Sequence, residues 1–137
     1  MIIDDRGRIF IQRRAADREL FPDSWDIVGG HVEPGESIQD TLRREIEEET
    51  GWTLSHVLAE LPMVEYVGDD GVPRVEEDFL VRVDGDLDRP RLTEHVEWRW
   101  IGESDIDGLG GDNPGDELLR RWVRLAFVTA REIGLID

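Results

Sequence analysis

Residues 30–52 read GHVEPGESIQDTLRREIEEETGW, and this stretch ends in a crowd of carboxylates. Four glutamates stand just before the last glycine: Glu45, Glu47, Glu48 and Glu49. Ser37 with Asp40 is typical of a capping box, which predicts a helix that runs to about Thr50. Carboxylates are unfavourable at a helix C-terminus, and like charges three or four residues apart repel each other. Helix formation alone therefore does not explain the glutamates.

Three of these glutamates share one face of the predicted helix. Positions i, i+3 and i+4 fall within an arc of about 100°, which places Glu45, Glu48 and Glu49 together. Glu47 points elsewhere. Carboxylate oxygens are preferred ligands of Mg²⁺ and Mn²⁺. The sequence therefore predicts a divalent cation, Mg²⁺ or Mn²⁺, on this helix face.

The size and composition of the chain are those of one ordinary domain. It has 137 residues, of which 39% are hydrophobic, so we expect a single domain over residues 1–137 with a real core. The sequence shows no apolar run near the length of a membrane span and no signal-peptide pattern, which favours a cytoplasmic protein that does not bind membranes. The first predicted strand is short, which leaves open whether the natural chain starts earlier.

The polar composition excludes several kinds of chemistry. The chain has no cysteine, and all 16 basic residues are arginine. This excludes thiolate zinc sites, a cysteine nucleophile, a Schiff-base lysine and a P-loop lysine. The net charge of −17 disfavours a broad nucleic-acid surface. A small phosphorylated substrate, held through metal ions and a few arginines, remains compatible with it.

Hydrophobic periodicity predicts a mixture of strands and two helices. The predicted strands are residues 1–3, 8–14, 25–28, 54–67, 72–83 and 96–101. The first helix should bury a stripe of Ile38, Leu42 and Ile46. Residues 103–113 are rich in glycine and aspartate and predict a surface loop. The second helix should begin near Pro114 with Asn113 as its N-cap, and should bury Trp122.

Residues 30–52 resemble the Nudix box, G-x5-E-x7-R-E-U-x-E-E-x-G-U, where U is a bulky apolar residue. The specified positions are matched by Gly30, Glu36, Arg44, Glu45, Ile46, Glu48, Glu49 and Gly51, and Trp52 fills a position that is usually aliphatic. The resemblance implies an α/β fold, the Nudix-type α/β/α sandwich with a mixed β-sheet. It also implies Mg²⁺-dependent hydrolysis of a nucleoside diphosphate linked to another moiety.

The resemblance also implies a metal site. Glu45, Glu48 and Glu49 would ligate one or more ions, and the carbonyl of Gly30 would supply a further oxygen. A glycine at that position lets the backbone approach the ion closely. Glu45 and Glu48 therefore count among the expected catalytic residues.

Further roles follow from the same resemblance. Arg44 would orient a glutamate, Glu36 would tie the loop to the helix, and Gly51 would close the helix. The general base varies within the family. Glu94 is our first candidate, and it is either this base or a solvated loop carboxylate, whereas we interpret Glu97 as solvated.

Substrate-binding residues are harder to assign. Arg13 and Arg14 end a predicted strand near the site, so either guanidinium is a candidate to clamp phosphate, although surface solubility explains them almost as well. Trp25 is a candidate platform for a base, although large aromatics lie more often in a core. The three histidines lack metal-ligand spacing and receive no metal: His31, His56 and His95.

Two other functions remain as alternatives. A non-catalytic Nudix-fold sensor of a nucleotide ligand would tolerate the loss of box glutamates, and all are present here. Isopentenyl-diphosphate isomerase is similar in fold, and residues 13–25 faintly resemble that group. Its chemistry relies on a cysteine, which this chain lacks. The resemblance also implies a possible homodimer.

Overall fold

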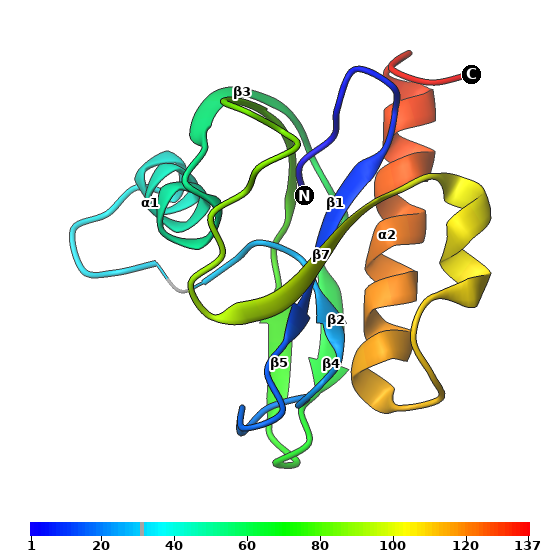
Figure 1. Cartoon of the computed structure of the whole chain (residues 1–137). Coiled ribbons are helices and arrows are strands. Elements are labelled where there is room, and N and C mark those ends of the chain that lie inside the picture. The colour runs from blue at the N-terminus through cyan, green and yellow to red at the C-terminus, as the bar shows by residue number, and fades with distance from the viewer. Residues whose placement is uncertain (31) are drawn as a thin grey trace.

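Two helices enclose the strands of the computed structural model, which describes residues 1–30 and 32–137. Helix α1 (Ile38–Thr50) lies on one side and helix α2 (Pro114–Glu132) on the other, as Figure 1 shows. Between them lie β1 (Ile9–Arg14), β2 (Trp25–Asp26), β3 (Thr53–Glu60), β4 (Val64–Val67), β5 (Pro73–Glu76), β6 (Phe79–Asp84) and β7 (His95–Ile101), and the 3₁₀ helix η1 (Glu103–Gly108) precedes α2. The expected helix–strand–helix layering is thus confirmed.

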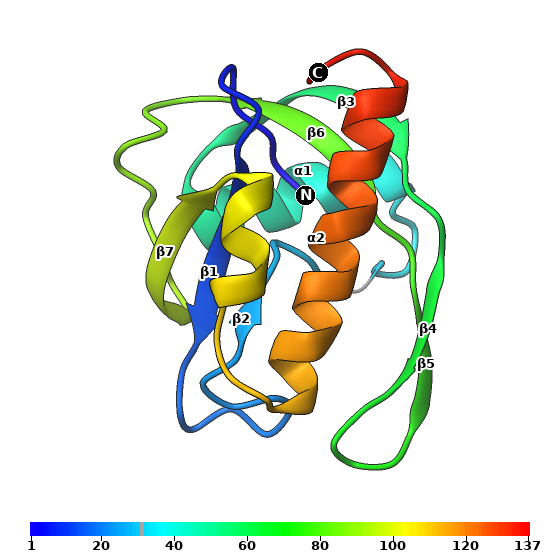
Figure 2. The ribbon, with the colours of Figure 1, turned by 90° about the vertical axis from the view of Figure 1, so that its right-hand side faces the viewer.

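The strands form three antiparallel groups, which the N-terminal residues link. The groups are β2-β1-β7, β3-β6 and β4-β5. Ile2 forms a parallel bridge with Val81 in β6, and Ile3 forms an antiparallel bridge with Ile9 in β1. The N-terminal residues therefore join two groups and make the strand arrangement mixed, as the sequence predicts. The third group, the β4–β5 hairpin, extends beside α2 (Figure 2).

The two long strands predicted over residues 54–67 and 72–83 are wrong as single elements. Each is divided into two strands, and the chain bends at residues 61–63 and 77–78. Pro62 lies in the first bend. Because proline has no backbone N–H, it cannot donate a hydrogen bond to a neighbouring strand. At the same level, Leu61 N donates to the carbonyl of Asp78 over 2.9 Å. These bends separate the β4–β5 hairpin from the β3–β6 pair.

Two further boundaries differ from the sequence prediction. Strand β2 ends at Asp26, whose own Oδ1 accepts the N–H of Ile27 over 2.8 Å and ends the ladder. The predicted surface loop at residues 103–113 contains η1. Its apolar residues Ile106 and Leu109 are buried in the core, which is why this segment is ordered into a helical turn.

The ends of both long helices follow their local sequence signals. Ser37 and Asp40 form the capping box of α1, and Gly51 closes it in the left-handed conformation at φ 77°. Asn113 caps α2, with Pro114 in the first turn. The predicted apolar stripe of α1 is only partly correct, since Ile46 is buried but Ile38 is 43% exposed. Ile38 lines an open pocket instead of the core.

The core confirms the buried position of Trp122 and contains two clusters. The larger cluster packs β1 and β2 against α2, and the smaller packs Phe10 and Trp52 near α1. Trp98 and Trp100 are partly buried against Phe10. Within the described residues, no helix combines the length and apolar character needed to cross a membrane.

Candidate functional site

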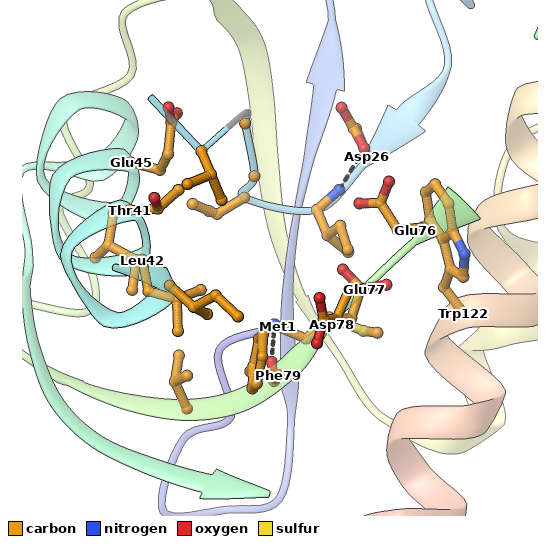
Figure 3. Close-up of a pocket in the computed structure, with 18 of the residues that line it drawn as sticks. Met1, Asp26, Thr41, Leu42, Glu45, Glu76, Glu77, Asp78, Phe79 and Trp122 are labelled. Carbon is orange, nitrogen blue, oxygen red and sulfur yellow. Dashed lines mark hydrogen bonds between the residues drawn. The ribbon is translucent and has the colours of Figure 1, made fainter. Parts of the chain in front are cut away.

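A pocket of about 500 Å³ opens between α1 and α2 and is bounded by the Gly29–Gly30 segment and by β5 (Figure 3). Glu45 lines it from the α1 side, and Glu76 and Asp78 line the wall near Trp122. Pockets of this size hold small ligands. The predicted metal-binding glutamate therefore faces a space large enough for a nucleotide-sized ligand.

Glu45 lies directly against the backbone of Gly30. A Cβ atom placed on Gly30 would come within 2.3 Å of the Glu45 carboxyl carbon and within 2.6 Å of both carboxyl oxygens. Any residue other than glycine would therefore displace the carboxyl group. The structure thus brings together the first and the fourth specified positions of the box, as a shared metal site requires.

Arg44 and Glu36 connect the loop before α1 to the helix. Nε and Nη2 of Arg44 donate to the two Glu36 oxygens over 2.7 and 2.9 Å. Glu36 also accepts from Glu33 N and Thr41 Oγ1, both over 2.9 Å. These bonds, above all that of Arg44, lower the pKa of Glu36 to about 2. Arg44 reaches Glu45 as well, so its placement fits the orienting role expected of it.

Glu49 is a buried carboxyl group behind this point. It is 7% exposed and accepts hydrogen bonds from Gln12 Nε2 and Gly29 N, both over 3.1 Å. Burial, together with the negative charges of Glu45 and Asp26, raises its pKa to about 9. A second negative charge beside Glu45 is therefore costly at this buried position, and Glu49 favours its protonated form when no cation is bound.

Two side chains near Glu49 carry no role in the sequence prediction. Asp26 lines the pocket and accepts from Arg14 Nη1 over 3.0 Å. The buried ring of His95 lies between the acids, with Nε2 at 3.8 Å from Asp26 and Nδ1 at 4.0 Å from Glu49. Neither ring nitrogen has a hydrogen-bond partner among the described residues. Asp26 and His95 lie beside Glu49 because β1 pairs with both β2 and β7. No local sequence signal predicts this strand pairing.

The remaining predicted residues lie at different distances from the pocket. Arg14 lines it but is held by Asp26 and by the carbonyl of Leu20. Arg13 pairs with Glu97 on the strand surface at 3.2 Å. Trp25 is 6% exposed in the core, where Arg99 covers its ring at 4.7 Å. This burial is a poor arrangement for a base-stacking surface.

Neither Glu94 nor Glu48 is among the residues that line the pocket. The Glu94 side chain is 61% exposed and pairs with Arg18 over 3.1 Å. Its neighbour Thr93 donates to the carbonyl of Glu48 over 3.1 Å, which holds the Glu94 loop beside the end of α1. Glu48 itself is exposed and approaches Arg44 Nη1 at 3.3 Å. His31 lies outside the described residues.

The oxygen atoms at this site are of the kind that a hard divalent ion prefers, although the carboxylates do not already form a complete ligand cluster. Among the residues that the structure describes, no group of three or more histidine, aspartate or glutamate side chains is arranged to hold a metal. Glu45 and Glu49 nevertheless offer oxygen donors only, and Gly30 leaves space beside Glu45. An ion there would offset the repulsion and burial that raise the pKa of Glu49.

Comparison with known proteins identifies the family. A model of the NUDIX domain matches residues 1–123. The chain belongs to the Nudix family. A solved MutT Nudix hydrolase from Burkholderia pseudomallei is 26% identical, with a TM-score of 0.67 over 87% of this chain and 90% of that one. The α/β Nudix fold predicted from residues 30–52 is therefore confirmed.

Curated relatives of this Nudix chain fall into different classes. An isopentenyl-diphosphate delta-isomerase of Brevibacterium linens is 29% identical over 110 residues, which are 77% of this chain and 60% of that protein. Nucleoside triphosphatase NudI of Escherichia fergusonii is 50% identical over 50 residues, 36% of each protein. The matches thus span three fifths or less of these two relatives. Nudix hydrolases generally use divalent metal ions.

Proposed function

We propose that this Nudix protein is a pyrophosphohydrolase that uses Mg²⁺ or Mn²⁺ to cleave the diphosphate of a small nucleotide derivative. One observation carries the proposal: Glu45 lies against Gly30 and lines the 500 Å³ pocket, with buried Glu49 behind it. This arrangement puts oxygen donors for a cation at the edge of a space for the ligand. Without the cation, the same acids would repel a diphosphate.

Glu45, Glu48, Glu49 and the Gly30 carbonyl would hold the ion. Bound there, a divalent ion offsets the charge of the diphosphate and makes water more acidic. Hydrolysis breaks one phosphorus–oxygen bond of the diphosphate bridge as water adds to that phosphorus, and the bridge oxygen leaves with the other product. The protein contributes mainly position and electrostatics to such a reaction.

The surrounding residues fix the donors in place. Arg44 is anchored by its two bonds to Glu36 and in turn holds Glu45. The N–H of Gly29 and the amide of Gln12 hold the two oxygens of Glu49. Such supporting bonds set the orientation of metal ligands. Arg14, which lines the pocket, remains a candidate for a phosphate contact, and Arg13 is a weaker one.

Glu94 remains the candidate general base, on a loop tied to the end of α1. Acting as a base requires its carboxylate to leave Arg18 and turn towards the pocket. Glu94→Gln should then lower the turnover rate while metal affinity, measured by calorimetry, stays unchanged. Glu97→Gln is the matched control on the adjoining strand. An unchanged rate in Glu94→Gln would remove the base role.

A substrate panel tests the function directly. Nucleotide sugars, ADP-ribose, dinucleotides and oxidised nucleoside triphosphates are incubated with Mg²⁺ in ¹⁸O-labelled water and followed by phosphorus NMR. Release of a mononucleotide or phosphate that carries ¹⁸O is expected for at least one compound, and the label identifies the attacked phosphorus. Binding of a nucleotide without any turnover would instead indicate the non-catalytic sensor.

The isomerase similarity supports a second candidate. The Brevibacterium linens enzyme matches 77% of this chain, which is more of the chain than NudI matches. The absence of cysteine argues against the same chemistry here. Isopentenyl diphosphate, incubated with the protein and Mg²⁺ and followed by proton NMR, should remain unchanged. Its isomerisation would favour the second candidate. Cytoplasmic location and a homodimer stay predictions.

A further inference from the structure

One buried imidazole beside the proposed metal site has no part in the proposed function. The side chain of His95, at the start of β7, is only 4% exposed. Neither Nδ1 nor Nε2 of its ring has a hydrogen-bond partner among the described residues. Buried polar groups are almost always hydrogen-bonded, because a buried group without a partner loses its bonds to water and gains none in return. The position of this ring therefore needs an explanation beyond packing.

The ring lies between two carboxyl groups that differ in their other partners. Its Nε2 is 3.8 Å from Asp26 Oδ2, and its Nδ1 is 4.0 Å from Glu49 Oε1. Asp26 Oδ2 already accepts a hydrogen bond from the guanidinium of Arg14 over 3.0 Å. Glu49 accepts from neutral groups, the side-chain amide of Gln12 and the backbone N–H of Gly29. Glu49 is therefore the acid that gains more from a donor on the ring.

The two oxygens of Glu49 have different surroundings. Oε1 accepts from the fully buried Gln12 and is the oxygen that His95 Nδ1 approaches. Oε2 accepts from the N–H of Gly29, which lines the pocket one residue before the close contact between Gly30 and Glu45. A second donor at Oε1 can therefore fix the carboxyl group from the protein interior while Oε2 stays on the pocket side.

We propose that His95 is a positioning residue for Glu49: its Nδ1–H donates to Glu49 Oε1 and holds the carboxyl group so that Oε2 is left for the ion. An N–H···O bond spans about 2.7–3.2 Å, so the 4.0 Å contact becomes a bond through a shift of about 1 Å in either side chain. Hydrogen bonds to ligating carboxylates fix their orientation and strengthen metal binding. His95 acts through Glu49 and touches neither ion nor substrate. The inference rests on the proposed function for the presence of the ion.

Three substitutions separate the role of each ring nitrogen from that of the ring volume. His95→Asn keeps an N–H donor near the position of Nδ1, His95→Gln keeps one near the position of Nε2, and His95→Phe keeps a ring without a donor. Mg²⁺ affinity is measured by calorimetry for each variant and for His56→Phe, the matched control at an exposed histidine of β3. His95→Phe and His95→Gln should each lose about tenfold or more in affinity. His95→Asn should retain most of the affinity, and His56→Phe should retain all of it.

Nitrogen NMR of the protein in EDTA tests the hydrogen bond itself, without Mg²⁺ and without catalysis. In ¹⁵N-labelled protein, Nδ1 of His95 should carry a proton that exchanges slowly with water, because the ring is buried and the proton is hydrogen-bonded. The exposed ring of His56 should show no such proton. Glu49→Leu, which keeps the side-chain bulk and removes the acceptor, should shift the Nδ1 proton signal and speed its exchange.

The outcomes separate this inference from the proposed function. Wild-type affinity in His95→Phe, or equal losses in all three His95 variants, would overturn the positioning role, and hydrolysis in the substrate panel would then leave the proposed function standing alone. A wild-type Nδ1 without a proton would overturn the role whether or not the protein binds Mg²⁺. If the wild type binds no Mg²⁺ and cleaves no compound, the proposed function fails, and the spectra still decide whether His95 donates to Glu49. Thermal melting identifies a variant that fails to fold, and the wild-type spectrum then remains decisive.

Discussion

The missing side chain at Gly30 leaves the space that the Glu45 carboxyl group occupies. A Cβ there would lie 2.3 Å from the carboxyl carbon, far inside a normal contact. The left-handed conformation explains other glycines of the chain, such as Gly51 at φ 77°. Gly30 has no such φ, so close approach is the reason that we assign to it.

Gly30→Ala should therefore weaken metal binding while the fold persists. The added methyl group pushes Glu45 away from the position at which it would meet the ion, so Mg²⁺ affinity measured by calorimetry should fall about tenfold or more. Gly108→Ala is the control, because no heavy atom lies within 4 Å of its Cβ position. Equal affinity in the two variants would mean that Glu45 is not a ligand from its observed position.

Arg44 is the residue whose contacts join the most parts of the site. It holds Glu36 with two bonds and reaches Glu45 and Glu48. Arg44→Ala should lower Mg²⁺ affinity or turnover by about 10–100-fold, the usual effect of losing a residue that orients metal ligands. Arg43→Ala, one residue away and exposed, should leave both unchanged. If Arg44→Lys restored the metal affinity, a positive charge alone would suffice. That result would contradict a role for the two hydrogen bonds from Arg44 to Glu36.

At the scale of elements, the β5 segment carries a pH-dependent cost in stability. Glu76 keeps its proton to a pH of about 8 in the folded protein, against 4.5 as its ordinary pKa. The folded state thus binds more protons in this range, so the contribution of Glu76 to stability is lost as pH rises from about 4.5 to 8. The neighbouring acids Asp78 and Asp26 act in the same direction, and the amino group of Met1 opposes them.

Glu76→Gln should remove this loss. Near pH 5 the variant and the wild type should melt at similar temperatures, because the wild-type residue is then neutral. At pH 8 the variant should be more stable by about 1–2 kcal/mol, or roughly 4–10 °C in Tm. Glu65→Gln, a control at an exposed position of β4, should show no such pH-dependent difference. A variant that is less stable at pH 8 would contradict the raised pKa.

Local sequence signals predict the two long helices of this fold. The positions of residues that meet through strand pairing depend on long-range contacts, which local signals do not predict. The capping box at Ser37, Gly51 and the Asn113–Pro114 start each act within one turn, so the sequence alone places both long helices. Asp26 and His95 meet only because β1 pairs with both β2 and β7. The bend at Pro62 divides the strand predicted over residues 54–67, and Leu61 beside it donates its N–H to the carbonyl of Asp78.

The candidate site was predictable to a similar extent. Helical spacing predicts one shared face for Glu45, Glu48 and Glu49, and the close approach of Gly30 to Glu45 agrees with the box resemblance. Helical spacing alone does not predict that Glu49 is buried or that Glu48 pairs with Arg44. Glu76 belongs to a hairpin that reaches the pocket only in the folded molecule, so no motif marks it.

On the scale of the whole molecule, the net charge of −17 makes bound cations a source of stability. Mg²⁺ at about 100 times its dissociation constant should raise the free energy of unfolding by about 2.7 kcal/mol, as measured by thermal or denaturant unfolding. Sodium chloride of equal ionic strength should not reproduce this gain. Glu49→Gln should reduce it, and a gain that is equal in Mg²⁺ and sodium chloride would indicate general screening.

The most direct test compares Glu45→Gln with Glu47→Gln in Mg²⁺-dependent cleavage of the best compound in the panel, followed by phosphorus NMR. Both changes remove one charge from the same helix, but Glu47 is exposed and outside the pocket. The metal-ligand role of Glu45 predicts a loss of at least about a hundredfold in turnover for Glu45→Gln, whereas Glu47→Gln should retain the wild-type rate. Equal turnover in the two variants would contradict it.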